Sequence, residues 1–172
     1  MSSLTETVIY LGLGSNLGDR GAYLRAALAA LRELTRVDAV SRVYESEPVG
    51  LLPQPDYWNL VIRARTTLEP LELLSHLKQI EVALGRGPAA RNAPRIIDID
   101  LLAYGQRVQH DLALDLPHPR MHERTFVLYP LAELAPEFRH PESGRSLPEL
   151  LAQLALPTRA VPLDGFVLEN GE

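Results

Sequence analysis

Two carboxylates interrupt an aliphatic run in the stretch Pro94-Arg95-Ile96-Ile97-Asp98-Ile99-Asp100-Leu101-Leu102. A short run of β-branched and aliphatic residues predicts a buried β-strand. Because side chains alternate between the two faces of a strand, Asp98 and Asp100 point to the same face, with their Cα atoms about 7 Å apart. Ile97, Ile99 and Leu101 then point to the opposite face, where we expect them in the core.

Two like charges on one face of a buried strand require a cationic partner, because burying unpaired charge is costly. A divalent metal is the simplest partner, and Arg86, Arg91 and Arg95 close by in the sequence indicate an anionic ligand beside it. Mg²⁺ suits such a pair, since it prefers oxygen ligands and is held by one or two carboxylates together with substrate phosphates. The alternative is that both aspartates lie at an exposed strand end, solvated or paired with arginine.

The length and composition favour a single globular domain. The 172 residues carry a formal net charge of −5 and contain no cysteine, which argues against nucleic acid as a partner and excludes disulfides and thiolate metal sites. No apolar run reaches the ~20 residues needed to span a membrane, and residues 1–6 lack the features of a signal peptide. We expect a cytoplasmic monomer without a membrane partner. Lys78 is the only lysine and lies in no P-loop motif, so a nucleotide would be bound through arginine and metal.

Hydrophobic periodicity around the carboxylate strand predicts an α+β fold. The expected elements are a strand over 8–14, a helix to about 34, strands over 37–44 and 57–67, a helix over 70–84, and the strand at 94–102. This β-α-β-β-α-β order over residues 8–103 is typical of the ferredoxin-like arrangement. We therefore expect a mostly antiparallel sheet with helices packed on one face.

The last third of the chain is expected to extend this core. Residues 126–134 form an apolar run that contains Pro130. This pattern predicts a short strand or an irregular helix. A final helix is expected over 147–156, whereas residues 157–172 carry no clear pattern. We predict one domain over residues 1–172, with its core at about 8–156.

Two long connections, residues 45–55 and 85–94, are rich in Pro, Gly and Arg. Long loops in compact domains are often lids or binding loops. The glycine pattern Gly12-x-Gly14-x-x-x-Gly18 resembles a dinucleotide-binding fingerprint, but its third glycine comes one position too late. We interpret these glycines as residues that let a strand end turn tightly into a helix, or as part of a site with Ser15 and Asn16.

Asn59 stands out because it is a polar residue inside a predicted strand, directly after two aromatic residues. A buried amide needs hydrogen-bond partners, and it could recognise the donor and acceptor edge of a heterocycle. Tyr57, Trp58 and Phe126 are more typical of a core than of a ligand platform. His118 fits either a surface position or a contact with phosphate.

Taken together, a collinear set of motifs resembles the hydroxymethyl-dihydropterin pyrophosphokinase family of folate synthesis. The resemblance covers about residues 8–141. Its segments are Tyr10-Leu11-Gly12-Leu13-Gly14-Ser15-Asn16-Leu17-Gly18, Tyr44-Glu45-Ser46-Glu47-Pro48-Val49-Gly50, Gln54-Pro55-Asp56-Tyr57-Trp58-Asn59, Ile80-Glu81, Leu84-Gly85-Arg86, Pro94 to Leu102, Leu116-Pro117-His118-Pro119-Arg120-Met121 and Arg124-Thr125-Phe126-Val127-Leu128.

The resemblance implies transfer of pyrophosphate from ATP to the hydroxymethyl group of 6-hydroxymethyl-7,8-dihydropterin, with release of AMP. It implies that two Mg²⁺ ions are held by Asp98 and Asp100. The residues that it places around the pterin are Ser46, Val49, Tyr57, Asn59 and Phe126. Those that it places on the ATP side are Glu81, Arg86, Arg95, Leu101, His118 and Arg124. The arginines expected to act in catalysis are Arg86, Arg91 and Arg95.

The chain departs from the family pattern at Lys78, Asn92 and Ala113, where some members carry glutamine, tryptophan and arginine, and its 85–94 loop is one residue shorter. Two other functions also fit the residues. One is a ferredoxin-like sensor that binds a nucleotide or pterin without turnover, and the other is a different two-metal phosphoryl or nucleotidyl transferase.

Overall fold

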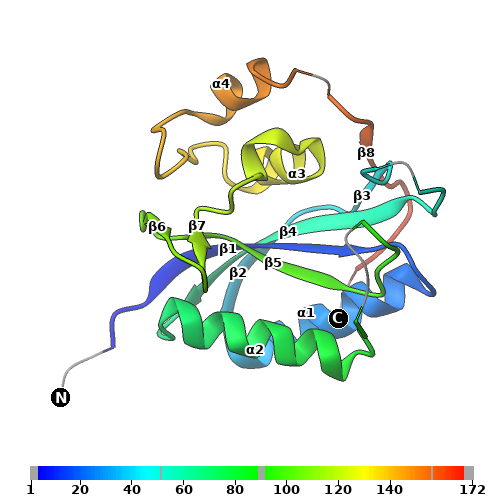
Figure 1. Ribbon diagram of the computed structural model, residues 1–172, viewed down its shortest axis with the longest axis horizontal. Helices are drawn as coiled ribbons and strands as arrows, with labels where there is room; N and C mark the ends of the chain where they lie inside the picture. Colours follow the sequence, from blue (N-terminus) through cyan, green and yellow to red (C-terminus); the bar gives the residue numbers. More distant parts are fainter. Residues whose placement is uncertain (1–3, 51, 89–91, 156, 169–172) are drawn as a thin grey trace.

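The computed structural model describes residues 4–50, 52–88, 92–155 and 157–168. An antiparallel sheet lies between two layers of helices (Figure 1). In chain order the elements are β1 (Thr7–Ser15), α1 (Arg20–Leu34), β2 (Arg36–Val40), β3 (Tyr44–Ser46), β4 (Tyr57–Thr66), α2 (Pro70–Ala83), β5 (Asp98–Tyr104), β6 (Gln109–His110), β7 (Asp115–Leu116), η1 (Met121–Glu123), α3 (Thr125–Leu134), α4 (Leu147–Ala152) and β8 (Ala160–Pro162).

Strand β1 lies inside the sheet, with β4 on one side and β5 on the other. The strand order is β5-β1-β4-β3-β8, and β2 also pairs with β4. Every strand pairing among the described residues is antiparallel. With β2 and β3 counted as one interrupted strand, since both pair with β4, the order of strands and helices from β1 to β5 is β-α-β-β-α-β. This is the order of the ferredoxin-like core, so the predicted fold class is confirmed.

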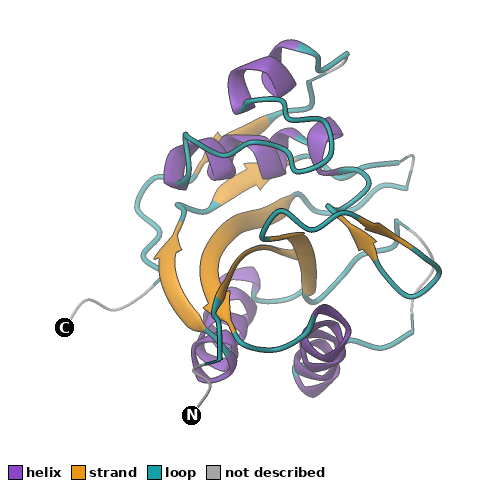
Figure 2. Ribbon diagram, turned by 90° about the vertical axis from the view of Figure 1, so that its left-hand side faces the viewer, coloured by secondary structure: helices purple, strands orange, loops and turns teal. Residues whose placement is uncertain are grey.

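Helices α1 and α2 cover one face of the sheet (Figures 1 and 2). Leu24, Leu28 and Leu31 recur at helical spacing on α1 and are buried. Leu73 and Leu77 of α2 are buried in the same way against this face of the sheet. The sheet residues in this hydrophobic cluster include Ile9, Leu11, Leu13, Ile97, Ile99 and Leu101. The prediction that Ile97, Ile99 and Leu101 are core residues is therefore confirmed.

The C-terminal extension covers the opposite face of the sheet, where α3 and α4 lie (Figure 2). Val61 on β4 and Leu102 on β5 are fully buried there against α3. Because these strands carry apolar side chains on both faces, the sheet needs a second helical layer to exclude water. Asp98 and Asp100 alternate with Ile97, Ile99 and Leu101, so they lie on this second face together with Leu102.

Some element boundaries differ from the predicted ones. The strand predicted over 37–44 is split into β2 and β3 at Ser41, whose side-chain Oγ accepts a hydrogen bond from the backbone N–H of Val61. The apolar run around Pro130 is a helix, and α4 ends at Ala152. Residues 160–162 add an edge strand beside β3. None of the helices in the described part of the chain is long and apolar enough to cross a membrane.

Candidate active site

A pocket of about 400 Å³ lies on the α3 side of the sheet, where β1, β4 and β5 run side by side. The two long loops and the segment before α3 contribute the rest of its walls. The predicted site residues that line it are Ser46, Val49, Tyr57, Asn59, Arg86, Arg95, Asp98, Asp100, His118, Arg124 and Phe126. The fold thus gathers residues that lie as far apart in the sequence as Ser46 and Phe126.

Two glycines of β1 form the floor of this pocket. Gly12 lies opposite Asp100, and Gly14 lies between Asp98 on β5 and Asn59 on β4. A Cβ on Gly14 would lie only 2.7 Å from the Oδ1 atom of Asn59. The interpretation of Gly12 and Gly14 as turn residues was therefore wrong, because both lie within the strand and leave space for neighbouring side chains. Gly18 does occupy a turn, with φ of 73°.

The two aspartates face the pocket together, as the strand pattern predicted. Asp98 Oδ1 lies 3.2 Å from Nη2 of Arg86, and Asp100 Oδ2 lies 3.9 Å from Nη1 of Arg124. Burial raises the pKa of both carboxyl groups, and the charge of Asp100 raises the pKa of Asp98 further. The arginines thus offset the paired charge only in part, and the site favours an additional cation.

Glu81 on α2 connects the helix to this carboxylate strand. Its side chain is 6% exposed, and its Oε2 atom accepts hydrogen bonds from the backbone N–H of Ile99 at 3.0 Å and from Nη1 of Arg86 at 2.7 Å. Burial raises the pKa of Glu81, while these donors oppose the shift. Arg86 therefore bridges Glu81 and Asp98, which fixes its guanidinium at the pocket wall.

The pterin-side residues predicted from the resemblance line the same pocket. Asn59 donates from Nδ2 to the Oγ atom of Ser46 at 2.6 Å, and both side chains are buried. Burial raises the pKa of Tyr57 to about 12, so its hydroxyl stays protonated. The guanidinium of Arg124 lies 5.4 Å from the ring centre of Phe126. Val49 lies at the rim and is largely exposed.

A second pocket of about 260 Å³ adjoins the first at Asp100. It lies between α2, β5 and residues 113–119, and it shares Arg86, Asp100 and His118 with the first pocket. Leu101 and Leu114 give it an apolar wall, and Glu81 also lines it. Burial beside the guanidinium groups of Arg124 and Arg120 lowers the pKa of His118 to about 4. Glu81, Arg86, Leu101 and His118 are thus brought together here, whereas Arg95 and Arg124 line the first pocket only.

Asn16 joins the two long loops beside the first pocket, a role that its residue type alone did not predict. Its Nδ2 donates to Oε1 of Gln54 at 2.7 Å, and its Oδ1 accepts from the backbone N–H of Arg95 at 2.8 Å. Gln54 in turn donates from Nε2 to the backbone oxygen of Asn92 at 2.8 Å. The position of Asn16 at the end of a glycine-containing strand was the only signal in the sequence. Arg91 lies outside the described residues.

The model of the family described as 7,8-dihydro-6-hydroxymethylpterin-pyrophosphokinase (HPPK) matches residues 10–136, which include every predicted site residue. The chain belongs to this family. A relative from Pseudomonas aeruginosa named 2-amino-4-hydroxy-6-hydroxymethyldihydropteridine pyrophosphokinase is 46% identical over 160 residues, which cover 92% of this chain and 94% of the relative. A protein of the same name from Aquifex aeolicus is 41% identical over 141 residues, covering 82% and 88% of the two chains.

Solved HPPK structures share the fold. A Plasmodium falciparum HPPK-DHPS structure with pteroate superposes with a TM-score of 0.69 at 16% identity, over 88% of this chain and 43% of that longer chain. At this identity the likeness concerns the fold alone.

The departures from the HPPK pattern lie at the pocket walls. Lys78 and Ala113 line the second pocket, and Asn92 lines the first. Asn92 has φ of 62°, a left-handed conformation that asparagine tolerates better than most residues do.

Proposed function

We infer that the protein transfers pyrophosphate from ATP to the hydroxymethyl group of 6-hydroxymethyl-7,8-dihydropterin, which gives the pterin diphosphate and AMP in folate biosynthesis. The observation that carries this inference is the carboxylate pair Asp98 and Asp100 at the junction of two pockets, in a chain that belongs to the HPPK family. Two substrates that react at a shared phosphate need two adjoining sites with cation-binding groups between them.

We propose that Asp98 and Asp100 hold Mg²⁺, with two ions expected when ATP is bound. The donor set fits this metal, because it consists of carboxylate oxygens and leaves positions for phosphate oxygens and water. Within the described residues there is no group of three or more His, Cys, Asp or Glu side chains that could hold a metal ion, so the two carboxylates are the ligands that this proposal assigns to the protein. The chemistry supplied by bound Mg²⁺ is neutralisation of charge on the phosphoryl oxygens.

The pterin is proposed to bind between Ser46, Tyr57, Asn59 and Phe126. The Asn59 amide presents both a donor and an acceptor, which matches the amide-like edge of a pterin, and the Phe126 ring offers a face for stacking. The Nδ2 atom of Asn59 already donates a hydrogen bond to the Oγ atom of Ser46 at 2.6 Å, which orients the amide. Val49 lies at the rim, on the connection between β3 and β4 that the structure bounds at residues 47–56, hereafter called the 47–56 loop. A separate pocket for a second heterocycle, besides the pocket proposed for adenosine, favours this function over a general nucleotidyl transferase.

ATP is proposed to occupy the second pocket with its triphosphate reaching Asp100. Leu101 and His118 would lie beside the adenosine, and Arg86, Arg95 and Arg124 would contact the phosphates. The pterin hydroxyl oxygen forms a bond to the β-phosphorus while the bond from that phosphorus to the α,β-bridging oxygen breaks. AMP leaves in line, and the hydroxyl proton is released to solvent. The arginines stabilise the charge that develops on the transferred group.

The loops 45–55 and 85–94 are proposed to exclude water from this reaction, because hydrolysis of ATP competes with transfer. The contact between Gln54 and Asn92 supports their acting together. We assign Arg91 to the same closure, as a sequence-based proposal. Residues 1–172 are proposed to form one domain, because β8 near the C-terminal end pairs with β3 in the same sheet. The protein is proposed to act as a monomer. The proposed location is the cytoplasm, where ATP is the co-substrate.

Incubation with ATP, Mg²⁺ and 6-hydroxymethyl-7,8-dihydropterin tests the function by identification of the nucleotide product. AMP that appears only when the pterin is present supports pyrophosphoryl transfer. ADP would contradict it, and binding of both substrates without any nucleotide product would favour a sensor.

A further inference from the structure

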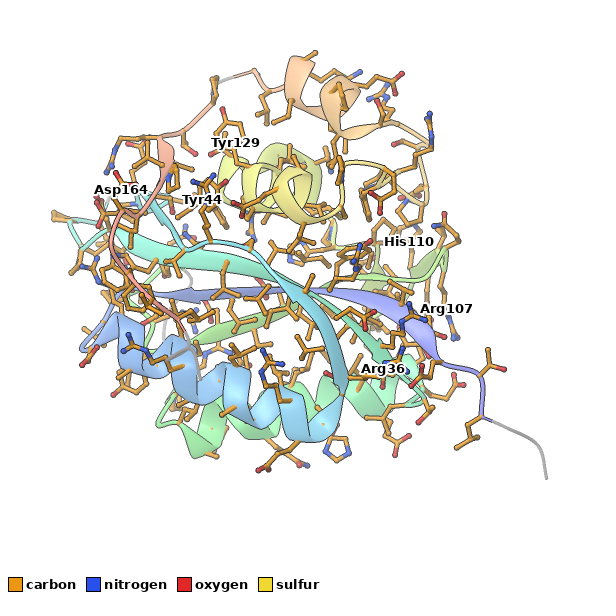
Figure 3. All side chains as sticks on the ribbon, turned by 180° about the vertical axis from the view of Figure 1, so that it is seen from behind. Arg36, Tyr44, Arg107, His110, Tyr129 and Asp164 are labelled. Carbon is orange, nitrogen blue, oxygen red and sulfur yellow. The ribbon has the colours of Figure 1, made fainter. Side chains whose placement is uncertain are left out.

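The segment Thr158–Ala160 lies outside the 10–136 range of the family match, yet it runs along the proposed pterin side of the pocket. It continues into β8, which pairs with β3 at the edge of the sheet. Figure 3 shows Tyr44 of β3 and Asp164 beyond β8 at one end of the molecule, opposite Arg107 and His110. Residues far apart in the sequence therefore meet at this end.

Thr158, Arg159 and Ala160 each contact a segment that contains or adjoins a residue proposed to bind the pterin. The backbone oxygen of Thr158 accepts a hydrogen bond at 2.9 Å from Oγ1 of Thr125, the residue before Phe126. Ala160 pairs with Ser46 in the register of β8 and β3. Arg159 forms an ion pair with Asp56, the residue before Tyr57.

Arg159 joins the two ends of the 47–56 loop. Its backbone N–H donates to Oε1 of Glu47 at 2.8 Å, at the start of the loop. Its guanidinium pairs with Asp56 at the end of the loop, and it also lies 3.9 Å from Oε1 of Glu45. Two carboxylates thus pair with the guanidinium, and a third accepts from the backbone N–H of the same residue. Without that positive charge, the carboxylates of Glu45 and Asp56 would face each other with less compensation, and the loop base would open.

A second cation near this end, Arg20, makes different contacts from those of Arg159. Arg20 lies 3.9 Å from Glu45 and donates to the backbone oxygen of Asp56 at 2.8 Å, but its guanidinium packs over the ring of Trp58 at 4.5 Å. Arg20 therefore supports the start of β4, while Arg159 is the residue whose side chain pairs with the Asp56 carboxylate.

We propose that the segment Thr158–Ala160 is a clasp for the pterin subsite, with Arg159 as a positioning residue that holds the 47–56 loop against β3 and the start of α3. The inference rests on the proposed function, because it concerns the pterin side of the same pocket. Arg159 contacts neither reacting group. It acts through Asp56 and Glu47 on the positions of Tyr57, Ser46 and Val49, so its removal should weaken binding of the pterin and leave the ATP side unchanged.

The test compares Arg159→Ala with Arg159→Lys and with the control Arg145→Ala, an exposed arginine in the same C-terminal third. Loss of a partly exposed ion-pair cluster is expected to raise the KM for the dihydropterin about fivefold. The KM for ATP and kcat should stay within about twofold, since the clasp lies on the pterin side alone. Arg159→Lys should restore most of the pterin affinity, because it keeps the positive charge.

Two further measurements separate the clasp from a general loss of structure. The dissociation constant of the dihydropterin, followed by its fluorescence without turnover, should rise by the same factor as KM. The difference between wild type and Arg159→Ala should shrink when the salt concentration increases from 0.1 to about 1 M, because salt screens exposed charges.

An unchanged pterin affinity in Arg159→Ala would overturn the clasp, as would an equal rise in the KM values for ATP and pterin. If the wild-type protein binds the dihydropterin but makes no AMP, the proposed function fails, while the fluorescence titration still tests the clasp.

Discussion

The Glu81 carboxylate on α2 accepts a hydrogen bond from the backbone N–H of Ile99 on β5, at 3.0 Å. Ile99 lies between Asp98 and Asp100, so this bond fixes the strand at the point where both aspartates leave it. The same Oε2 atom accepts from Arg86, which also contacts Asp98. Glu81 was predicted on the ATP side, and its position favours a role in orienting Arg86 and the strand.

Glu81→Ala is expected to destabilise the fold, because it leaves the buried backbone N–H of Ile99 without its acceptor and removes the partner of Arg86. An unsatisfied buried donor costs roughly 1–3 kcal/mol, so we expect a loss of about 2 kcal/mol in the free energy of unfolding. Urea denaturation of the ligand-free protein measures it. The control is Glu72→Ala on the exposed face of the same helix, and equal stability of the two variants would contradict the role of Glu81.

Gly14→Ala is expected to weaken pterin binding, because its Cβ would lie 2.7 Å from Oδ1 of Asn59 and displace that amide. We expect a rise of about tenfold in the dissociation constant of the dihydropterin, which corresponds to about 1.4 kcal/mol. Gly12→Ala is the matched control, since its Cβ would meet Leu102 at an ordinary 3.5 Å. Equal effects of the two alanines on pterin binding would show that the glycine floor does not set the Asn59 position.

Asp100→Asn is expected to lower kcat at least about a hundredfold, because it removes the charge of one of the two carboxylates proposed to hold the cation at the phosphates. The fold should persist. Burial raises the pKa of Asp100 above its value in the unfolded chain, so its ionised form destabilises the ligand-free protein at neutral pH. The thermal midpoint without ligands should therefore stay the same or rise. Asp164→Asn, at an exposed site beyond β8 (Figure 3), is the control. An active Asp100→Asn variant would refute the metal proposal.

Because His118 is buried, we expect the ligand-free protein to lose stability as the pH falls. Its pKa is about 4 in the fold, below the value of about 6.5 expected in the unfolded chain. The neutral ring therefore contributes stability that is fully present above pH 6.5 and is lost as the pH falls toward 4. The free energy of unfolding should fall less between pH 7.5 and 5 in His118→Asn than in wild type. Asparagine retains an acceptor for the backbone N–H of Arg120.

The matched control for this pH experiment is His76→Asn on α2, which should keep the pH dependence of the wild-type protein. If His118→Asn also keeps that dependence, another group causes the acid sensitivity.

The local pattern of the sequence predicted the ferredoxin-like core well. Leu24, Leu28 and Leu31 repeat at a helical period, and Asp98 and Asp100 alternate with isoleucines at a strand period, so each element was visible within its own window. Residues 126–134 were ambiguous, because Pro130 disturbs a short apolar run that either element could contain. In the structure this run is a helix whose apolar side chains pack against Val61 of β4 and Leu102 of β5, a contact that the local sequence does not show.

The remaining features depend on contacts between distant residues. The need for Gly14 arises from Asn59 on the neighbouring strand, and the role of Glu81 arises from the packing of α2 against β5. The clasp depends on β8 pairing with β3, across more than a hundred residues. The resemblance brought the site residues together as a list, but it could not show that Arg86 bridges Glu81 and Asp98.

The most direct test of the central claim is to follow the β-phosphate of ATP. The protein is incubated with Mg²⁺, 6-hydroxymethyl-7,8-dihydropterin and ATP labelled at the β-phosphorus, and the products are separated. The account predicts that the label leaves the nucleotide and appears on the pterin as a diphosphate, with unlabelled AMP in equal amount. Label that remains on the nucleotide as ADP, with a pterin monophosphate, would contradict it.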